Sequence, residues 1–169
     1  MSETEGQKPK ISRLAIAEIV AAVIIFLLII AILWPVLIRL CEYRRRIRCG
    51  ENLTGLGKAM IISACYCDDK YPTPDKWCDL LIKYAEMTEK EFVCPSAGGG
   101  RCHYAMNPNA KLTSTPDIVV LFETKGGWNQ FGGPELVTFE NHEGKGCNVL
   151  FNDFSVEFVK PERLGELKW

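Results

Sequence analysis

The chain has 169 residues and a near-neutral charge, with 20 Lys and Arg against 21 Asp and Glu. This balance excludes a broadly basic surface, so we expect no nucleic-acid partner. The one dense basic cluster, residues 39–49, directly follows an apolar segment, which favours contact with lipid headgroups. With that segment set aside, about 130 residues remain, enough for one modest domain.

Residues 14–40 are the most apolar part of the chain. Positions 19–38 carry only apolar residues and Pro35, and a helix of this length matches the ~30 Å hydrocarbon core of a bilayer. The run is longer than the ~7–15-residue core of a signal peptide and lacks a small-residue cleavage site at its end. We therefore predict a single transmembrane helix over 14–40, kinked at Pro35, after a leader or cytoplasmic tail over 1–13.

Two signals disagree about the orientation of this helix. Three Lys or Arg precede it and five lie in residues 39–48, which by the positive-inside rule would place the C-terminal domain in the cytoplasm. Against this, seven of the eight cysteines follow Cys41, a density typical of a disulfide-permissive compartment. We favour an extracytoplasmic domain.

Helical periodicity continues beyond the membrane segment. Apolar residues recur at spacings of three or four through 41–67, which predicts one long helix that stops at the turn-rich "CDDKYPTPD". A second, short amphipathic helix is expected over 75–87. Thr88 and Glu91 then have the spacing of a capping box, and residues 94–116 are predicted to be a loop.

The C-terminal part of the chain has the pattern of strands. Four β-branched and aromatic runs are bounded by turn residues, at 117–124, 135–141, 147–153 and 155–160, and the last two predict a hairpin around 152–155. Helices followed by strands predict an α+β fold, in which a domain over 68–169 forms an antiparallel sheet covered by the long helix.

The cysteines after the membrane segment are candidates for disulfides. They are Cys49, Cys65, Cys67, Cys78, Cys94, Cys102 and Cys147. Their pairing cannot be deduced from sequence, although Cys94 and Cys102 could close the glycine-rich loop between them. We found no arrangement typical of a serine or cysteine nucleophile and expect no enzyme.

Metal binding is the alternative use of these residues. Zinc sites usually contain paired C-x₂₋₄-C motifs, and the chain offers only the C-x-C of Cys65 and Cys67. Further soft ligands are Cys94, Cys102, His103, His142 and Cys147. Asp153 or Glu143 could contribute to a calcium site. We expect no resident cofactor and keep zinc and calcium as alternatives.

Several short motifs follow one another in a defined order. Counted from Leu14, glutamate is the fifth residue, Glu18, and proline the twenty-second, Pro35. The downstream motifs are Cys49, Asn52-Leu53, Leu56-Gly57-x-Ala59, Tyr66, Asp68-Asp69, Tyr71-Pro72, Cys94-Pro95-Ser96, Tyr104-x-Met106-Asn107 and Asn148 to Asp153. The chain resembles type IV pilins and type II secretion pseudopilins, and its downstream part resembles the prepilin-like proteins of planctomycetes and related bacteria.

The resemblance implies a structural or assembly subunit with a pilin-like fold, anchored in the bacterial inner membrane. Its partners would be the lipid bilayer and other pilin-like subunits, whose N-terminal amine would pair with Glu18. Some secretion pseudopilins bind calcium. The chain departs from the pattern at Arg13, where the prepilin peptidase requires glycine, at Phe154, where the branch has glycine, and at His142, one residue farther from Asp153.

These departures leave an alternative open. If Arg13 blocks processing, the protein is an uncleaved single-pass membrane protein whose extracytoplasmic domain binds a ligand and does not polymerise. Glu18 would then pair with Arg13 of a neighbour or reach water at the membrane interface.

Overall fold

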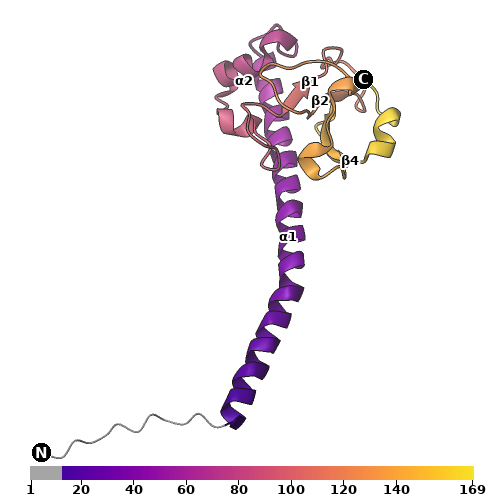
Figure 1. Ribbon diagram of the computed structural model, residues 1–169. Coiled ribbons are helices and arrows are strands. Elements are labelled where there is room, and N and C mark those ends of the chain that lie inside the picture. The colour runs from indigo at the N-terminus through magenta and orange to yellow at the C-terminus, as the bar shows by residue number, and fades with distance from the viewer. Residues whose placement is uncertain (1–12) are drawn as a thin grey trace, which may run out of the picture. The chain divides into compact units, whose positions relative to one another are not determined.

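The computed structural model describes residues 13–169, with side chains from residue 16 onward. Two helices and four strands make up the regular structure: α1 (Arg13–Ala64), α2 (Trp77–Ala85), β1 (Tyr104–Met106), β2 (Val119–Glu123), β3 (Cys147–Phe151) and β4 (Val156–Val159). Five short 3₁₀ segments connect them: η1 (Pro74–Lys76), η2 (Glu89–Phe92), η3 (Pro134–Leu136), η4 (Glu140–His142) and η5 (Pro161–Glu166). The predicted α+β order of helices before strands is confirmed (Figure 1).

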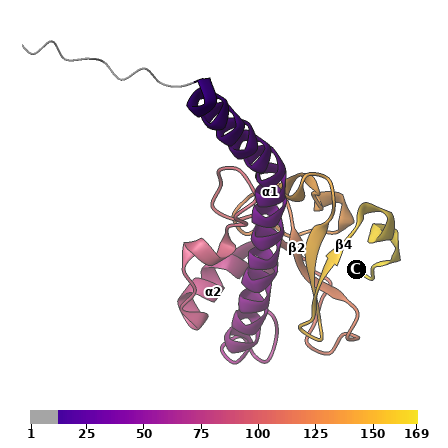
Figure 2. The same ribbon diagram turned by 90° about the horizontal axis from the view of Figure 1, so that it is seen from below.

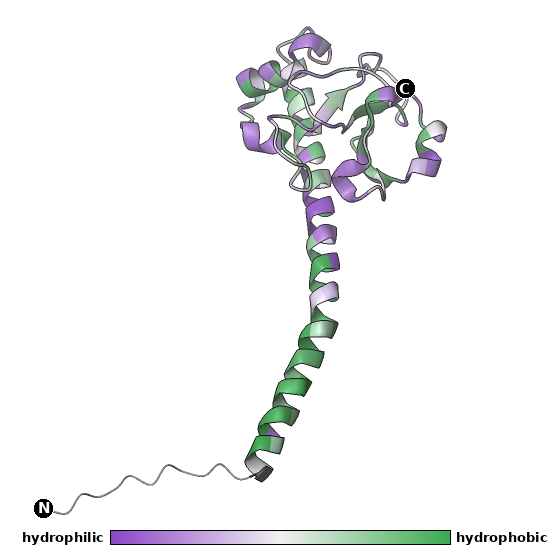
Figure 3. Ribbon diagram, in the orientation of Figure 1, coloured by the Kyte–Doolittle hydropathy of each residue, from purple (hydrophilic) through white to green (hydrophobic). Residues whose placement is uncertain are grey.

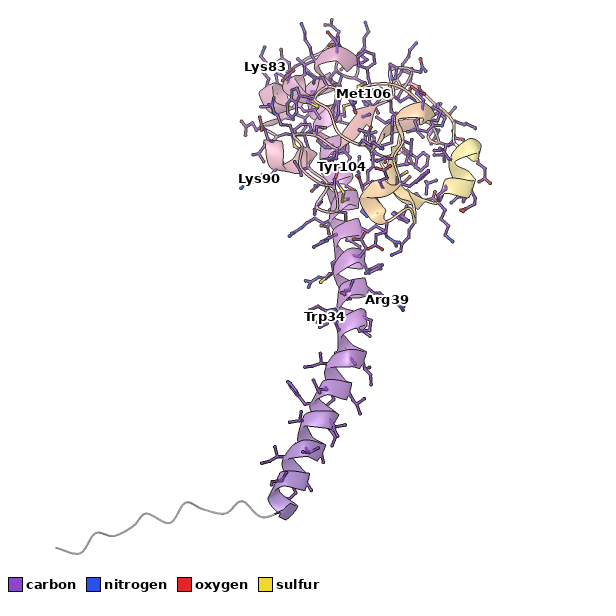
Figure 4. All side chains as sticks on the ribbon, in the orientation of Figure 1. Trp34, Arg39, Lys83, Lys90, Tyr104 and Met106 are labelled. Carbon is purple, nitrogen blue, oxygen red and sulfur yellow. A yellow bond between two sulfur atoms is a disulfide. The ribbon has the colours of Figure 1, made fainter. Side chains whose placement is uncertain are left out.

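The chain divides into two compact units, the first ending at Cys41 and the second comprising Glu42–Trp169. In the first unit, every side chain described between residues 16 and 40 is exposed. Apart from Glu18 and Arg39, this part of α1 is mostly apolar (Figure 3), and Trp34 and Arg39 project away from the helix axis (Figure 4). By length and composition, α1 contains one segment that could span a membrane.

Helix α1 runs without interruption through Pro35 and ends at Ala64, three residues before the predicted end at 67. The kink expected at Pro35 stays a prediction. The leader or tail predicted over 1–13 lies outside the described residues except for its last residue.

In the second unit, the C-terminal half of α1 lies between α2 and the sheet (Figure 2). Leu53, Leu56 and Met60 are fully buried there, in one core cluster with residues of α2 and of the sheet. Gly57 makes the close approach feasible, because a Cβ at this position would lie 2.9 Å from a methyl carbon of Leu150 on β3. A larger residue would require the side chain of Leu150 to shift.

The four strands form one antiparallel sheet in the order β1-β2-β3-β4. One face packs on α1. The opposite face carries a second core cluster around Phe122 and Val149, which is covered by Leu136, Phe139 and Trp169 from the 3₁₀ segments and the C-terminus. Both faces of the sheet are therefore buried, which accounts for the nearly continuous apolar character of β2 and β3.

Two local predictions are wrong. Residues 94–116 contain strand β1, which exists because Tyr104–Met106 pairs with β2, a long-range contact that no local pattern announces. Residues 135–141 form no strand but lie in η3, η4 and the turn between them, with a single bridge from Val137 to Thr124. Proline at position 134 has no N–H and starts a 3₁₀ turn, which removes this segment from the sheet ladder.

Two other local predictions are confirmed. The capping box of Thr88 and Glu91 is present in full at η2. The last two strands, β3 and β4, pair as a hairpin through the turn at 152–155.

Candidate functional site: a buried charge cluster beside a disulfide

A disulfide joins α1 to the segment that follows η2. It links Cys49 to Cys94 across 45 residues, with a Cα–Cα distance of 5.1 Å, and both residues are fully buried. Cys94 therefore pairs with Cys49 and not with Cys102, the partner that the glycine-rich loop suggested. This bond fixes the helix against the loop beside the sheet.

Glu123 is a fully buried carboxylate at the end of β2. It faces α1, because its cross-strand partner Tyr104 lies on that face and donates a hydrogen bond to the backbone carbonyl of Cys49, at 3.3 Å. Asn148 of β3 holds both carboxylate oxygens. Its backbone N–H donates to Oε2 at 2.9 Å, and its side-chain amide donates to Oε1 at 3.1 Å.

His142 lies between two carboxylates. It comes from η4 and is 1 % exposed, with Nε2 at 3.1 Å from Glu123 Oε1 and Nδ1 at 3.0 Å from Glu42 Oε1. Burial disfavours the charged imidazole, but the hydrogen bonds and charges of Glu123 and then Glu42 outweigh it, so the pKa of His142 is raised above its usual value. The cluster favours an imidazolium that donates from both nitrogens.

The sulfur atoms of the disulfide border this ion cluster. Cys94 Sγ lies 3.8 Å from His142 Nε2, and the donor atoms of Cys49, Cys94, Glu123 and His142 all lie within 4.8 Å of one another. All four residues are buried. Among the described residues, these are the sulfur, nitrogen and carboxylate donors that converge closely enough to hold a metal ion.

The structure brings together only part of the set that the sequence suggested, and of the seven candidate disulfide cysteines only Cys49 and Cys94 are bonded. Cys94 and His142 meet in this cluster. Cys65 and Cys67 lie just past the end of α1, the first exposed and the second half-buried. Cys147 is buried on the sheet face opposite α1, and burial, together with the nearby charge of Glu123, raises the pKa of its thiol to about 12.

Cys78 and Cys102 form a second sulfur pair in the core, with their Sγ atoms 4.0 Å apart and no disulfide between them. Burial raises the pKa of the Cys78 thiol, and its hydrogen bond to Cys102 acts in the same direction. These two thiols therefore behave as apolar core groups in the structure.

The two residues put forward for calcium stand at opposite ends of β3. Asp153 accepts hydrogen bonds from the backbone and hydroxyl of Ser155, and Glu143 forms an ion pair with Lys145. Each carboxylate thus has a local partner, and the geometry gives no support to a shared calcium site.

His103 lies outside the donor cluster. It is 1 % exposed, and burial lowers its pKa below the usual value. The imidazole of His103 therefore binds a proton more readily in the unfolded chain than in the folded one. As the pH falls below about 6.5, protonation favours the unfolded chain, and the contribution of His103 to stability is lost. We expect the free energy of unfolding at pH 5, relative to its value at pH 7.5, to be higher in His103→Gln than in the unmodified protein, as measured by urea denaturation at each pH; the raised pKa of His142 affects both proteins alike. Equal slopes would contradict the assignment.

A pocket of about 460 Å³ lies elsewhere in the domain, between the turn after α1 and the loop after β1. Tyr71, Met106 and Leu112 supply apolar walls, and Asp69 and Lys111 supply charge. Tyr71 also donates a hydrogen bond to Asn152 at 2.8 Å, which ties this turn to the β3–β4 hairpin.

Sequence reasoning missed Glu123, Glu42 and Asn148 as members of the cluster. A signal for Glu123 was present, since a carboxylate ends the apolar run of β2 on the same face as Leu121. The interaction with Glu42 spans 100 residues of sequence, and no local pattern could have indicated it.

Comparisons of the chain with protein-family models, with curated proteins and with solved structures found no match.

Proposed function

We propose that the protein is a membrane-anchored, pilin- or pseudopilin-like structural or assembly subunit of a type II secretion or type IV pilus-like system. One observation carries the proposal. A single continuous helix, α1, exposes its apolar N-terminal part completely, while its C-terminal part forms the core of an α+β domain. The exposed part would lie in the bilayer, where it can pack against the same segment of other subunits.

The position of Glu18 supports assembly. It is the one charged residue between positions 16 and 38 and its side chain is exposed. A charge in the membrane centre costs about 2.5 to 3.5 kcal/mol on insertion scales, so such a group usually faces an oppositely charged partner. A cation from a neighbouring subunit would satisfy it and would align the subunits along their helices.

The turn of the β3–β4 hairpin gives further support. Phe154 has a φ of 66°, in the left-handed region that favours glycine, and the prepilin-like branch has glycine at the equivalent position. Phenylalanine therefore takes a backbone conformation here that glycine adopts at no steric cost. The side chain of Phe154 lies near Gly57 of α1.

We expect Glu18→Gln to weaken contact between subunits without affecting insertion or domain folding. The amide is easier to bury in lipid than the carboxylate, but it loses the charge-assisted pairing. The measurement is cysteine crosslinking in membranes through Ala22→Cys, with Cys41, Cys65 and Cys67 replaced by serine. Glu51→Gln, an exposed carboxylate on the same helix outside the apolar segment, is the matched control.

The expected result is a large loss of crosslinked dimer in Glu18→Gln and none in Glu51→Gln. If both variants crosslink like the parent protein, Glu18 does not mediate assembly. Extraction of membranes at alkaline pH checks in parallel that each variant remains inserted.

The pocket beside Tyr71 favours a second candidate function, a permanently anchored binding domain that does not polymerise. Arg13 at the expected cleavage position agrees with this alternative. Mass analysis of the N-terminus in the native host distinguishes the two. A chain that starts at Leu14 supports the assembly subunit, and a chain that retains residues 1–13 supports the anchored binding domain.

A further inference from the structure

The buried cluster beside the disulfide has a donor set suited to a metal. We propose that, when the Cys49–Cys94 disulfide is reduced, Cys49, Cys94, His142 and Glu123 bind one zinc ion. The inference concerns the domain alone and does not depend on the assembly role proposed above.

The distances between donors fit a tetrahedral zinc site. With zinc about 2.0 to 2.3 Å from its nitrogen, oxygen and sulfur ligands, neighbouring ligands of a tetrahedron lie about 3.3 to 3.8 Å apart. His142 Nε2 is 3.1 Å from Glu123 Oε1 and 3.8 Å from Cys94 Sγ. The remaining donor atom, Cys49 Sγ, lies within 4.8 Å of the other three. Small side-chain movements complete the tetrahedron once the two sulfur atoms separate.

Neighbouring residues already orient these ligands. Glu42 accepts a hydrogen bond from His142 Nδ1 at 3.0 Å, which leaves Nε2 directed at the sulfur and carboxylate atoms. Metal-bound histidines commonly have such a carboxylate on their second nitrogen. Asn148 holds Glu123 Oε2 through its backbone N–H, so that Oε1 remains on the side of His142. Thiolate, imidazole and carboxylate are each ligands that zinc accepts.

Stability alone does not explain this cluster. Two carboxylates share one buried imidazole. Replacing such buried ion pairs by apolar residues is often neutral or stabilising. Glu123 is fully buried and Glu42 is 15 % exposed, so both pay for desolvation. A bound dication would coordinate Glu123 and His142 directly, so that these buried polar atoms would be satisfied by the metal in place of the ion pair.

The disulfide and the zinc site exclude each other. Two sulfur atoms on one zinc ion lie about 3.7 Å apart, whereas a disulfide holds them at about 2.05 Å. A dithiol reductant supplies two electrons and two protons to the disulfide, giving two cysteine thiols, and is itself oxidised to a disulfide. Zinc then displaces one proton from each thiol and the proton on His142 Nε2, while Glu123 binds as the carboxylate.

The test uses the full-length chain in detergent micelles. One sample is reduced with a trialkylphosphine. The phosphine takes the oxygen of water and becomes the phosphine oxide, and the two protons of that water complete the two thiols. The other sample remains oxidised. Both samples are titrated with Zn²⁺ and desalted. The amount of bound zinc per chain is then measured by elemental mass spectrometry. We expect one zinc per reduced chain and none per oxidised chain.

Three variants assign the ligands. Cys94→Ser removes a ligand and should abolish stoichiometric zinc binding. Glu42→Gln should weaken the zinc affinity by about 10- to 100-fold, because Glu42 acts on the metal only through its hydrogen bond to His142. The matched control, Cys65→Ser with Cys67→Ser, removes two thiols outside the cluster and should bind zinc like the parent chain.

A spectroscopic readout keeps the test decisive if a variant fails to fold. Co²⁺ added to the reduced, unmodified chain should show the intense visible absorption of tetrahedral coordination together with thiolate-to-metal charge transfer. Absence of these bands in a folded, reduced chain would overturn the proposal, as would equal zinc binding by Cys94→Ser and the parent, or its loss in the Cys65, Cys67 control.

Discussion

Glu123→Ala is expected to lower the free energy of unfolding of the domain by about 3 to 5 kcal/mol, the usual cost of breaking a buried ion pair from one side. The variant leaves the backbone N–H and side-chain amide of Asn148 without their acceptor, and it leaves His142 with only one carboxylate. Each buried polar group without a partner adds a desolvation penalty. Urea denaturation of the oxidised, full-length chain in detergent, followed by near-ultraviolet circular dichroism, measures the change.

Two further variants show that the effect arises from burial and not from the loss of any glutamate. Glu140, which pairs with Lys125 on the surface and is 73 % exposed, should change stability by no more than about 0.5 kcal/mol as Glu140→Gln. Glu123→Gln keeps the shape of the side chain and one acceptor oxygen. Its loss of unfolding free energy should lie between those of Glu123→Ala and Glu140→Gln. A loss below about 1 kcal/mol in Glu123→Ala would mean that water or rearrangement satisfies Asn148 and His142.

Removing the disulfide is the second change with a large expected effect. Cys49→Ala combined with Cys94→Ala should lower the free energy of unfolding by about 2 to 5 kcal/mol, because the unfolded chain is no longer closed into a loop. The loop spans 45 residues, and both sulfur atoms lie in the main core cluster, so lost packing adds to the effect. The measurement is the urea midpoint of the full-length chain, with a metal chelator present to exclude zinc.

Reduction provides an internal check. Reductant should lower the midpoint of the parent protein and leave the double alanine variant unchanged, since the latter has no bond to break. Cys65→Ser with Cys67→Ser, which alters thiols outside the core, should respond to reductant as the parent does. A parent midpoint that reductant does not move would contradict the structural role of Cys49–Cys94.

Local pattern predicted the elements whose determinants lie close together in sequence. Apolar spacing through 41–67 predicted the continuation of α1, and the Thr88–Glu91 spacing predicted the capping box at η2. The β3–β4 hairpin followed from two adjacent runs with turn residues between them. In each case the stabilising contacts join residues a few positions apart, so a single sequence window contains the information.

Local pattern gave the wrong structure for two other segments. Tyr104–Met106 is too short to signal a strand by itself and becomes one by pairing with β2, whereas 135–141 has strand-like residues but ends in 3₁₀ turns. The strand propensity of the residues is a weak guide in such cases, because the preference of a residue for a strand depends on the surface against which it packs.

The sequence alone predicts a helix apolar enough to span a membrane and a small α+β domain behind it. Only the tertiary structure decided which cysteines meet and that Glu123, His142 and Glu42 form one buried cluster beside them. The reason is physical. Periodicity records which residues face the core, but the distances between donors from α1, β2 and η4 are set by how these elements pack, and side-chain chemistry depends on those distances.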